Sequence, residues 1–174
     1  MTSYTFNGSG ELTKSFVDDN IGPATSITIT GYTYIGFQAF SDKNITSVDI
    51  GNSVITISAD AFRSCTSLTA VTIPDSVTSI GVWAFISCTS LTKVTIGISV
   101  KTIGNDAFRY CNQLTGTLTI PDSVETIGNN VFDGCTSLTA VIMGNGVTKI
   151  GGDVFARCTS LTAFSVDVGN TNYI

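Results

Sequence analysis

The five cysteines of the 174-residue chain recur at intervals of 23 or 24 residues, and this repeat is the feature that most restricts the fold. They are Cys65, Cys88, Cys111, Cys135 and Cys158. In every case a phenylalanine precedes the cysteine by three residues, and an isoleucine precedes the phenylalanine by five. A fixed period of this length is typical of a solenoid, because one unit is too short to bury its own apolar side chains.

The period divides the chain into four segments, which are an N-terminal cap (1–23), a degenerate unit (24–44), five full units (45–160) and a truncated unit (161–174). Residues 1–23 do not fit the period. Within them, Leu12 and Phe16 are four residues apart, which predicts a short capping helix over 11–19. Seven stacked rungs would extend over roughly 35 Å at the usual spacing of neighbouring strands.

The unit at 68–90 shows how one rung is expected to fold. Val71 and Ile73 alternate as one face of a β-strand does. Phe85 and Cys88 have helical spacing, which predicts a single helical turn later in the unit. The sequence therefore predicts an α/β repeat solenoid that contains a parallel β-sheet and short helical turns.

The repeat L-T-x-V-T-I-P-D-S-V-T-x-I-G-x-x-A-F-x-x-C over residues 24–174 resembles the BspA-like, treponemal-type leucine-rich repeat. The resemblance implies a curved solenoid with the parallel β-sheet on its concave face and the helical turns on its convex face. It implies protein interaction or adhesion, often at a cell surface, and no catalytic residues. The unit beginning at Leu161 resembles a variant repeat that normally continues, which implies that the chain is a fragment or lacks its usual C-terminal cap.

Composition and charge exclude several classes of function. The net charge of −5 provides no basic footprint for nucleic acid and argues against docking on an anionic membrane. The chain has no histidine, which excludes Ser-His-Asp and Cys-His catalysis. No apolar run approaches the roughly 20 residues of a membrane span. We therefore expect no enzyme activity, no cofactor and no metal.

The sequence leaves the compartment open. The first residues have neither the basic region nor the apolar region of a signal peptide. The family resemblance suggests a cell-surface or secreted protein. An odd number of cysteines without a disulfide framework instead favours a reducing compartment, such as the cytoplasm.

Two columns of the repeat could carry chemistry. The cysteines are too far apart in sequence for a typical metal motif, and stacked side chains point the same way, so we predict a ladder of buried thiols. Asp60, Asp106 and Asp153 share a column with Trp83 and Asn130. We predict that these polar residues open the turns rather than form a catalytic pair of carboxylates.

The first candidate binding surface is the outward side of the predicted concave strands. Its two columns contain Ser47, Ala70, Lys93, Thr117, Ala140 and Ala163, and then Asp49, Thr72, Thr95, Thr119, Ile142 and Ser165. From them we select Asp49, Thr72, Lys93, Thr95, Thr119 and Ile142 as candidate partner-binding residues. One extra residue around Gly116-Thr117 predicts a β-bulge in this surface.

The second candidate surface consists of residues that are apolar or aromatic where the other units are polar. They are Val82, Trp83, Ile86, Ile98 and Tyr110. Tryptophan and tyrosine on a polar surface are typical interface anchors. The alternative is sequence drift, with Trp83 lying across its neighbours on the convex side.

The predicted function is a non-catalytic protein-interaction or adhesion module. The alternative is a glycan-binding surface module, although the outward strand columns contain no aromatic row. The exposed strand edge at the C-terminal end could also cause self-association.

Overall fold

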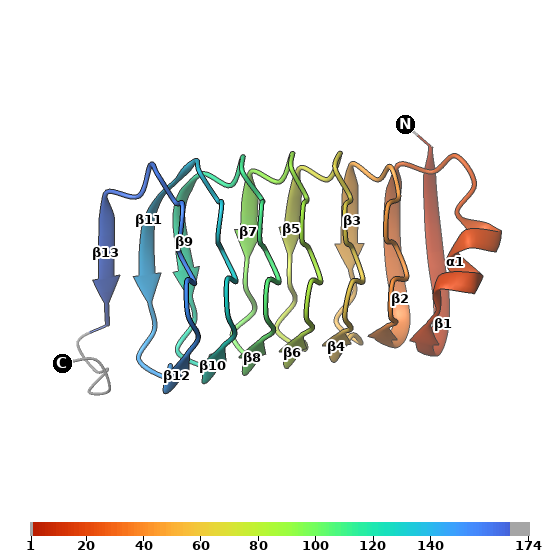
Figure 1. Ribbon diagram of the computed structural model, residues 1–174. Helices are drawn as coiled ribbons and strands as arrows, with labels where there is room; N and C mark the ends of the chain where they lie inside the picture. The colour runs from red at the N-terminus through yellow and green to blue at the C-terminus, as the bar shows by residue number, and fades with distance from the viewer. Residues whose placement is uncertain (1, 168–174) are drawn as a thin grey trace.

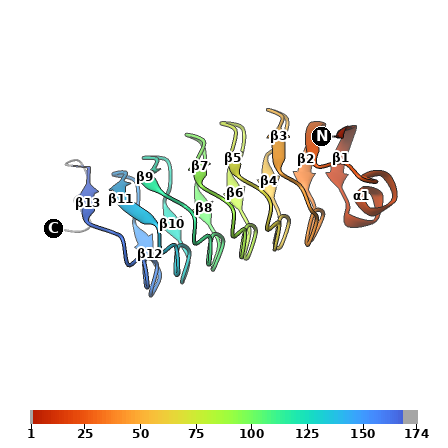
Figure 2. The ribbon, with the colours of Figure 1, turned by 90° about the horizontal axis from the view of Figure 1, so that it is seen from above.

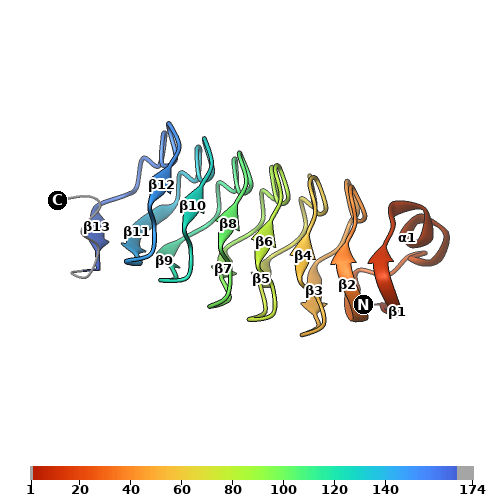
Figure 3. The ribbon, with the colours of Figure 1, turned by 90° about the horizontal axis from the view of Figure 1, so that it is seen from below.

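The computed structural model describes residues 2–167 of the chain, which coil into a parallel β-solenoid (Figure 1). Each repeat unit forms one rung, and successive rungs stack along a single axis, as the views from above and below show (Figures 2 and 3). The strands that pair are parallel.

Each rung has three sides. The side that we call the sheet face contains β3 (Ser47–Ile50), β5 (Ala70–Thr72), β7 (Lys93–Thr95), β9 (Gly116–Ile120), β11 (Leu138–Met143) and β13 (Ala163–Val166). The short-strand side contains β4 (Thr56–Ile57), β6 (Ser79–Ile80), β8 (Thr102–Ile103), β10 (Thr126–Ile127) and β12 (Lys149–Ile150). The turn side comprises residues 36–46, 58–69, 81–92, 104–115, 128–137 and 151–162. Corners at residues 51–55, 73–78, 96–101, 121–125 and 144–148 join the sheet face to the short-strand side.

Two long strands begin the solenoid. They are β1 (Ser3–Leu12) and β2 (Ser26–Ile35), and β2 pairs with β3 through its first half and with β4 through its second half. One sheet therefore runs in the order β1-β2-β4-β6-β8-β10-β12, with β3 attached to β2.

The 23-residue spacing also relates β1 to β2, so the prediction that the N-terminal segment does not fit the period is wrong for residues 3–12. Phe6 pairs with Ile29 and Leu12 pairs with Ile35, in both cases 23 residues later. Both N-terminal side chains are buried. The sequence does not reveal this rung, because Phe6 takes the place of an isoleucine and the segment lacks the cysteine.

The predicted capping helix is present, but it begins later than expected. It is α1 (Lys14–Asn20), and the hydroxyl of Thr13 accepts a hydrogen bond of 3.3 Å from the Phe16 N–H at its N-terminus. Leu12 belongs to strand β1 and is fully buried, whereas Phe16 is exposed. The two residues therefore do not share a helical face.

The predicted helical turns on the turn side are not observed. Trp83 and Ser87 have φ of 58° and 59°, a left-handed conformation that interrupts any helix. The N–H of Phe85 donates to the carbonyl of Ala107 in the next rung at 2.7 Å. The same pattern recurs in the other rungs, so α1 is the only α-helix among the described residues. Spacing does not distinguish the two structures, because a segment with left-handed residues at 83 and 87 also buries both Phe85 and Cys88.

A column of phenylalanine rings forms the centre of the core. Phe40, Phe62, Phe85, Phe108, Phe132 and Phe155 follow one another with centroid distances of 5.0–5.5 Å and interplanar angles of 5° or less. The first five of these rings have no exposed surface. Apolar burial and stacking both favour this arrangement.

The sheet face is interrupted at two places. Strands β5 and β7 form one sheet, and β9, β11 and β13 form another, so the ladder is broken between β3 and β5 and between β7 and β9. A proline follows the strand on one side of each break, namely Pro74 after β5 and Pro121 after β9. Proline has no N–H to donate to the preceding rung, which accounts for both positions.

Candidate functional site

The predicted outward columns lie on the sheet face as expected. Thr72 pairs with Thr95, and Ile142 pairs with both Thr119 and Ser165. Eleven of the twelve column residues are exposed, and Ala140 is half-buried. The sheet face therefore presents a regular set of small side chains, with Lys93 as its one cationic member.

The predicted bulge is confirmed. The register between β9 and β11 shifts between Leu138 and Ala140, and Gly116 at the start of β9 has φ of 76°. A left-handed residue of this kind is typical of a bulge that contains glycine. The extra residue therefore changes the course of the chain next to the break between β7 and β9.

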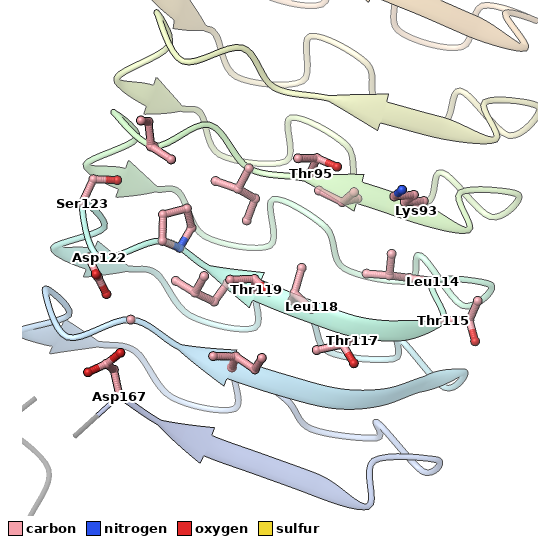
Figure 4. Close-up of a pocket in the computed structure, with 17 residues that line it drawn as sticks. Lys93, Thr95, Leu114, Thr115, Thr117, Leu118, Thr119, Asp122, Ser123 and Asp167 are labelled. Carbon is pink, nitrogen blue, oxygen red and sulfur yellow. The ribbon is translucent and has the colours of Figure 1, made fainter. Parts of the chain in front are cut away.

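The two breaks in the sheet face coincide with two hollows. The larger hollow lies between β7 and β9 and has a cavity volume of about 640 Å³ (Figure 4). The smaller one lies along β3, β5 and β7 and has a cavity volume of about 520 Å³. Seven of the eleven predicted partner-binding residues line one or both hollows, namely Asp49, Thr72, Lys93, Thr95, Ile98, Thr119 and Ile142.

Ile98 belongs to the sheet face, which corrects its grouping with Trp83. It lines both hollows, and 70% of its side chain is exposed. It lies at the corner after β7, where the carboxylate of Asp75 accepts a 3.0 Å hydrogen bond from the Ile98 N–H. The equivalent bond from the Asn145 N–H to Asp122 is 2.9 Å. The repeat identified Ile98 as exceptional but did not show which side this corner faces.

Val82, Trp83 and Ile86 lie together in one turn-side segment. Val82 and Trp83 are exposed, and Ile86 is half-buried. They form a small apolar patch on the turn side, separate from the hollows that Ile98 lines.

Tyr110 lies in the next turn-side segment and is part of an ionic cluster. The guanidinium carbon of Arg109 lies 4.6 Å from the centre of its ring, and that of Arg157 lies 5.3 Å away. The ring lies against Gly134, where a Cβ atom would approach it to 2.7 Å. Tyr110 therefore has intramolecular partners, which supports a structural role for its exposed ring.

The same two arginines hold Asp133, whose side chain is 4% exposed. Arg157 Nε donates to Asp133 at 2.8 Å, and Arg109 Nε donates to it at 3.0 Å. The hydrogen bonds from Arg157, together with the nearby positive charge, hold the pKa of Asp133 below its usual value, although its burial acts in the opposite direction. This cluster ties three successive rungs together.

The acidic column on the turn side is explained by backbone conformation. Asp60, Asp106, Asn130 and Asp153 have φ between 54° and 57°. Aspartate and asparagine tolerate this left-handed region better than most residues. They therefore occur at the turns, as predicted, but for their backbone conformation rather than as helix caps.

Replacing Trp83 with asparagine is expected to raise the free energy of unfolding by about 1 kcal/mol, because a bulky residue is strained in the left-handed region. Urea denaturation measures this change, and Asn130→Trp in the same column should lower stability by a similar amount. A loss of stability in Trp83→Asn would instead show that the ring is a packing element of the fold.

The cysteine column is confirmed as a ladder of buried thiols. The cysteines are free, four are buried and Cys158 is half-buried. Each thiol donates to the carbonyl of a phenylalanine in the preceding rung, at distances of 3.1–3.4 Å. Burial raises the pKa of the Cys65 thiol to about 12 and raises the pKa of the other four as well. The structure of the described residues shows no group of three or more side chains that could hold a metal ion.

The raised pKa values predict that the buried thiols react slowly with disulfide reagents. An aromatic disulfide reagent at about pH 8 should label only Cys158 in the folded protein, because thiolate is the reactive form. All five cysteines should react after unfolding in urea. Rapid labelling of more than one thiol in the folded protein would contradict the buried ladder.

The raised pKa values of the thiols also predict that the folded protein becomes less stable at high pH. Above pH 9.0, the ordinary pKa, the thiols ionise in the unfolded chain but stay protonated in the fold. The free energy of unfolding should therefore fall as the pH rises from 9.0 towards about 12, where Cys65 ionises in the fold. Urea titrations at several pH values measure this decline, which should be smaller in Cys65→Ala.

The C-terminal end of the described structure leaves apolar side chains exposed. Phe164 in β13 is 50% exposed, although its partner Val141 in β11 is buried. The segment 168–174 of the predicted truncated unit lies outside the described residues. No helix among the described residues is long and apolar enough to cross a membrane.

The fold and its repeat define a leucine-rich-repeat solenoid. A family model described as BspA type leucine rich repeat region matches residues 33–162 in six copies. The chain therefore belongs to the BspA type leucine-rich repeat family. Members of this family are generally non-catalytic and serve as protein-interaction or surface modules.

Solved structures of bacterial leucine-rich repeat proteins are similar to the chain. A leucine-rich repeat protein of T. pallidum is 29% identical, with a TM-score of 0.65, over 83% of this chain and 59% of its own. A leucine-rich cell surface protein of Faecalibacterium prausnitzii is 27% identical, with a TM-score of 0.53, over 95% of this chain and 49% of its own.

A leucine-rich repeat protein of Eubacterium ventriosum shares the fold, at 22% identity and a TM-score of 0.62, over 99% of this chain and 41% of its own. The chain thus spans between 41% and 59% of the lengths of these three structures. No curated protein matches the chain significantly.

Proposed function

We propose that this chain is a non-catalytic protein-binding or adhesion module that holds its partner on the sheet face. The observation that carries the proposal is the position of the hollows, since both lie on the sheet face and most of the predicted residues line them. Family membership supports the same class of function, and similarity to a bacterial cell surface protein supports presentation at a cell surface.

The sheet face also suits a protein partner physically. Its outward residues are mostly small and polar, and the exposed isoleucines Ile98 and Ile142 lie at the larger hollow. A central apolar contact surrounded by polar residues is the usual composition of a protein interface. The twelve outward residues include no aromatic ring on which a sugar could stack, which favours a protein over a glycan.

A pair of exposed threonines tests the proposal. Thr95 lies on the sheet face, and Thr102 lies on the short-strand side of the same unit. Partners are selected from a displayed library of protein fragments, and their affinity for Thr95→Arg and Thr102→Arg is measured. We expect Thr95→Arg to abolish binding and Thr102→Arg to leave it unchanged.

The opposite pattern, or equal loss in both variants, would contradict a site on the sheet face. A glycan array probed with the same proteins separates the alternative class. Glycan binding that is lost in Thr95→Arg, without any protein partner, would replace the proposed protein-binding function with a glycan-binding one.

A further inference from the structure

Three departures from the repeat converge on the hollow between β7 and β9. Lys93 replaces small residues, Ile98 replaces aspartate or asparagine, and Ile142 stands in a column that is otherwise polar. All three line this hollow (Figure 4). Because the rest of the repeat shows what stacking alone requires, their convergence points to a function of this hollow.

At the hollow, one backbone carbonyl lacks the N–H donor that the equivalent carbonyls of Ile29 and Ile120 have. The carbonyl of Ile50 lacks it too, because Pro74 stands one rung later. The N–H of Gly144 donates to the carbonyl of Ile120 at 2.9 Å, and the N–H of Gly51 donates to that of Ile29 at 2.8 Å. Pro121 occupies the equivalent position one rung after Ile96 and has no N–H. The carbonyl of Ile96, a residue that lines the hollow, therefore lacks this donor.

Charge is distributed unevenly along the hollow. Asp122 and Asp167 lie towards one end, and Lys93 lies towards the other (Figure 4). Asp122 is exposed, and its bond to the Asn145 N–H uses Oδ1. Hydroxyl groups of Thr95, Thr119 and other residues line the space between. Asp122 thus offers a hydrogen-bond acceptor and negative charge at this end.

Apolar surface lies beside these acceptors. Ile98 is 70% exposed and Ile142 is 43% exposed. Lysine and arginine carry an aliphatic stem that packs on apolar surface and a cationic head that donates hydrogen bonds. Their shape and charge therefore match the hollow, whereas an acidic side chain would meet Asp122 and Asp167.

We propose that the hollow binds an extended segment of the partner protein through one arginine or lysine side chain. The stem of that side chain lies between Ile98 and Ile142, and its head pairs with Asp122. Lys93 repels a second cation at the far end, so the segment is neutral or acidic there. This inference rests on the proposed function and specifies the chemistry of the partner.

A displayed library of random peptides, selected on the wild-type protein, tests this inference. We expect enriched peptides with one basic residue, binding that weakens with ionic strength, and loss of binding in Thr95→Arg. Asp122→Asn should weaken binding about tenfold, since it removes one charge-assisted contact. Asp153→Asn is the control, because Asp153 is exposed on the turn side, away from both hollows, and asparagine already occupies its column at Asn130.

Asparagine preserves this type of bond, as Asn105 and Asn129 accept backbone N–H groups at 2.8 Å on the turn side. Both variants should therefore fold, and only Asp122→Asn should lose affinity. Enrichment of acidic peptides, equal effects of the two variants, or a library that yields no binder blocked by Thr95→Arg would overturn the inference. Fragments that Thr95→Arg blocks but Asp122→Asn does not would leave the proposed function standing without this inference.

Discussion

Replacing Phe85 with alanine is expected to lower the free energy of unfolding by about 4 kcal/mol, the usual cost of a large cavity in a core. The ring is fully buried and stacks between Phe62 and Phe108, at 5.0 and 5.1 Å. Both stacking contacts are lost together with the apolar burial. Since domains of this size are stable by roughly 5–15 kcal/mol, this one change would remove a large share of the total.

Urea denaturation followed by circular dichroism measures the effect. Phe37→Ala is the control, because the Phe37 side chain is 57% exposed and should cost less than about 1 kcal/mol. A similar small loss in Phe85→Ala would mean that the phenylalanine column does not hold the rungs together.

Replacing Gly104 with alanine is expected to cost about 3 kcal/mol, the upper part of the usual range for overpacking. A Cβ atom at this position would lie 2.6 Å from the Val82 backbone nitrogen and 2.7 Å from the Gly81 carbonyl carbon. Backbone atoms cannot rotate away as a side chain can, so two rungs would have to separate.

Gly152→Ala is the matched control. There the nearest atom is the Asn129 side-chain oxygen at 3.9 Å, and we expect stability to change by less than about 0.5 kcal/mol. Equal stability of Gly104→Ala and the wild type would show that the rungs are not as closely packed as the structure indicates.

Much of the fold could be predicted because the repeat reports inward and outward positions directly. Val77 and Ile80 are buried, and Thr72 and Thr95 are neighbours on the sheet face. The strand columns, the buried cysteines and the bulge at Gly116 all follow from aligning the units. The extra residue near Gly116 lengthens only its own unit, because the other units keep their register. Its position therefore becomes visible when the units are aligned.

Local backbone conformation could not be predicted in the same way. A helical turn and a pair of left-handed turns both place Phe85 and Cys88 on the inside, so spacing does not distinguish them. The first rung was missed because residues 3–12 keep only the inward pattern, with Phe6 and Leu12 in place of two isoleucines.

The site was only partly predictable for a related reason. Columns identify Ile98 as exceptional, but only the structure shows that its corner opens onto the sheet face. The effect of Pro121 was also missed. An N–H at this position would have donated to the carbonyl of Ile96 in the preceding rung, so the consequence lies about one period away in sequence.

Binding on the sheet face is tested most directly by finding which surface of the protein a partner touches. A peptide selected on the whole protein is titrated into isotopically labelled protein, and the backbone amide resonances are followed by NMR. If the partner binds at the hollow between β7 and β9, the shifted resonances belong to Lys93–Ile98, Gly116–Ser123 and Ile142. Shifts centred on Val82, Trp83 and Ile86, with the hollow unchanged, would contradict binding on the sheet face and place the binding surface on the turn side.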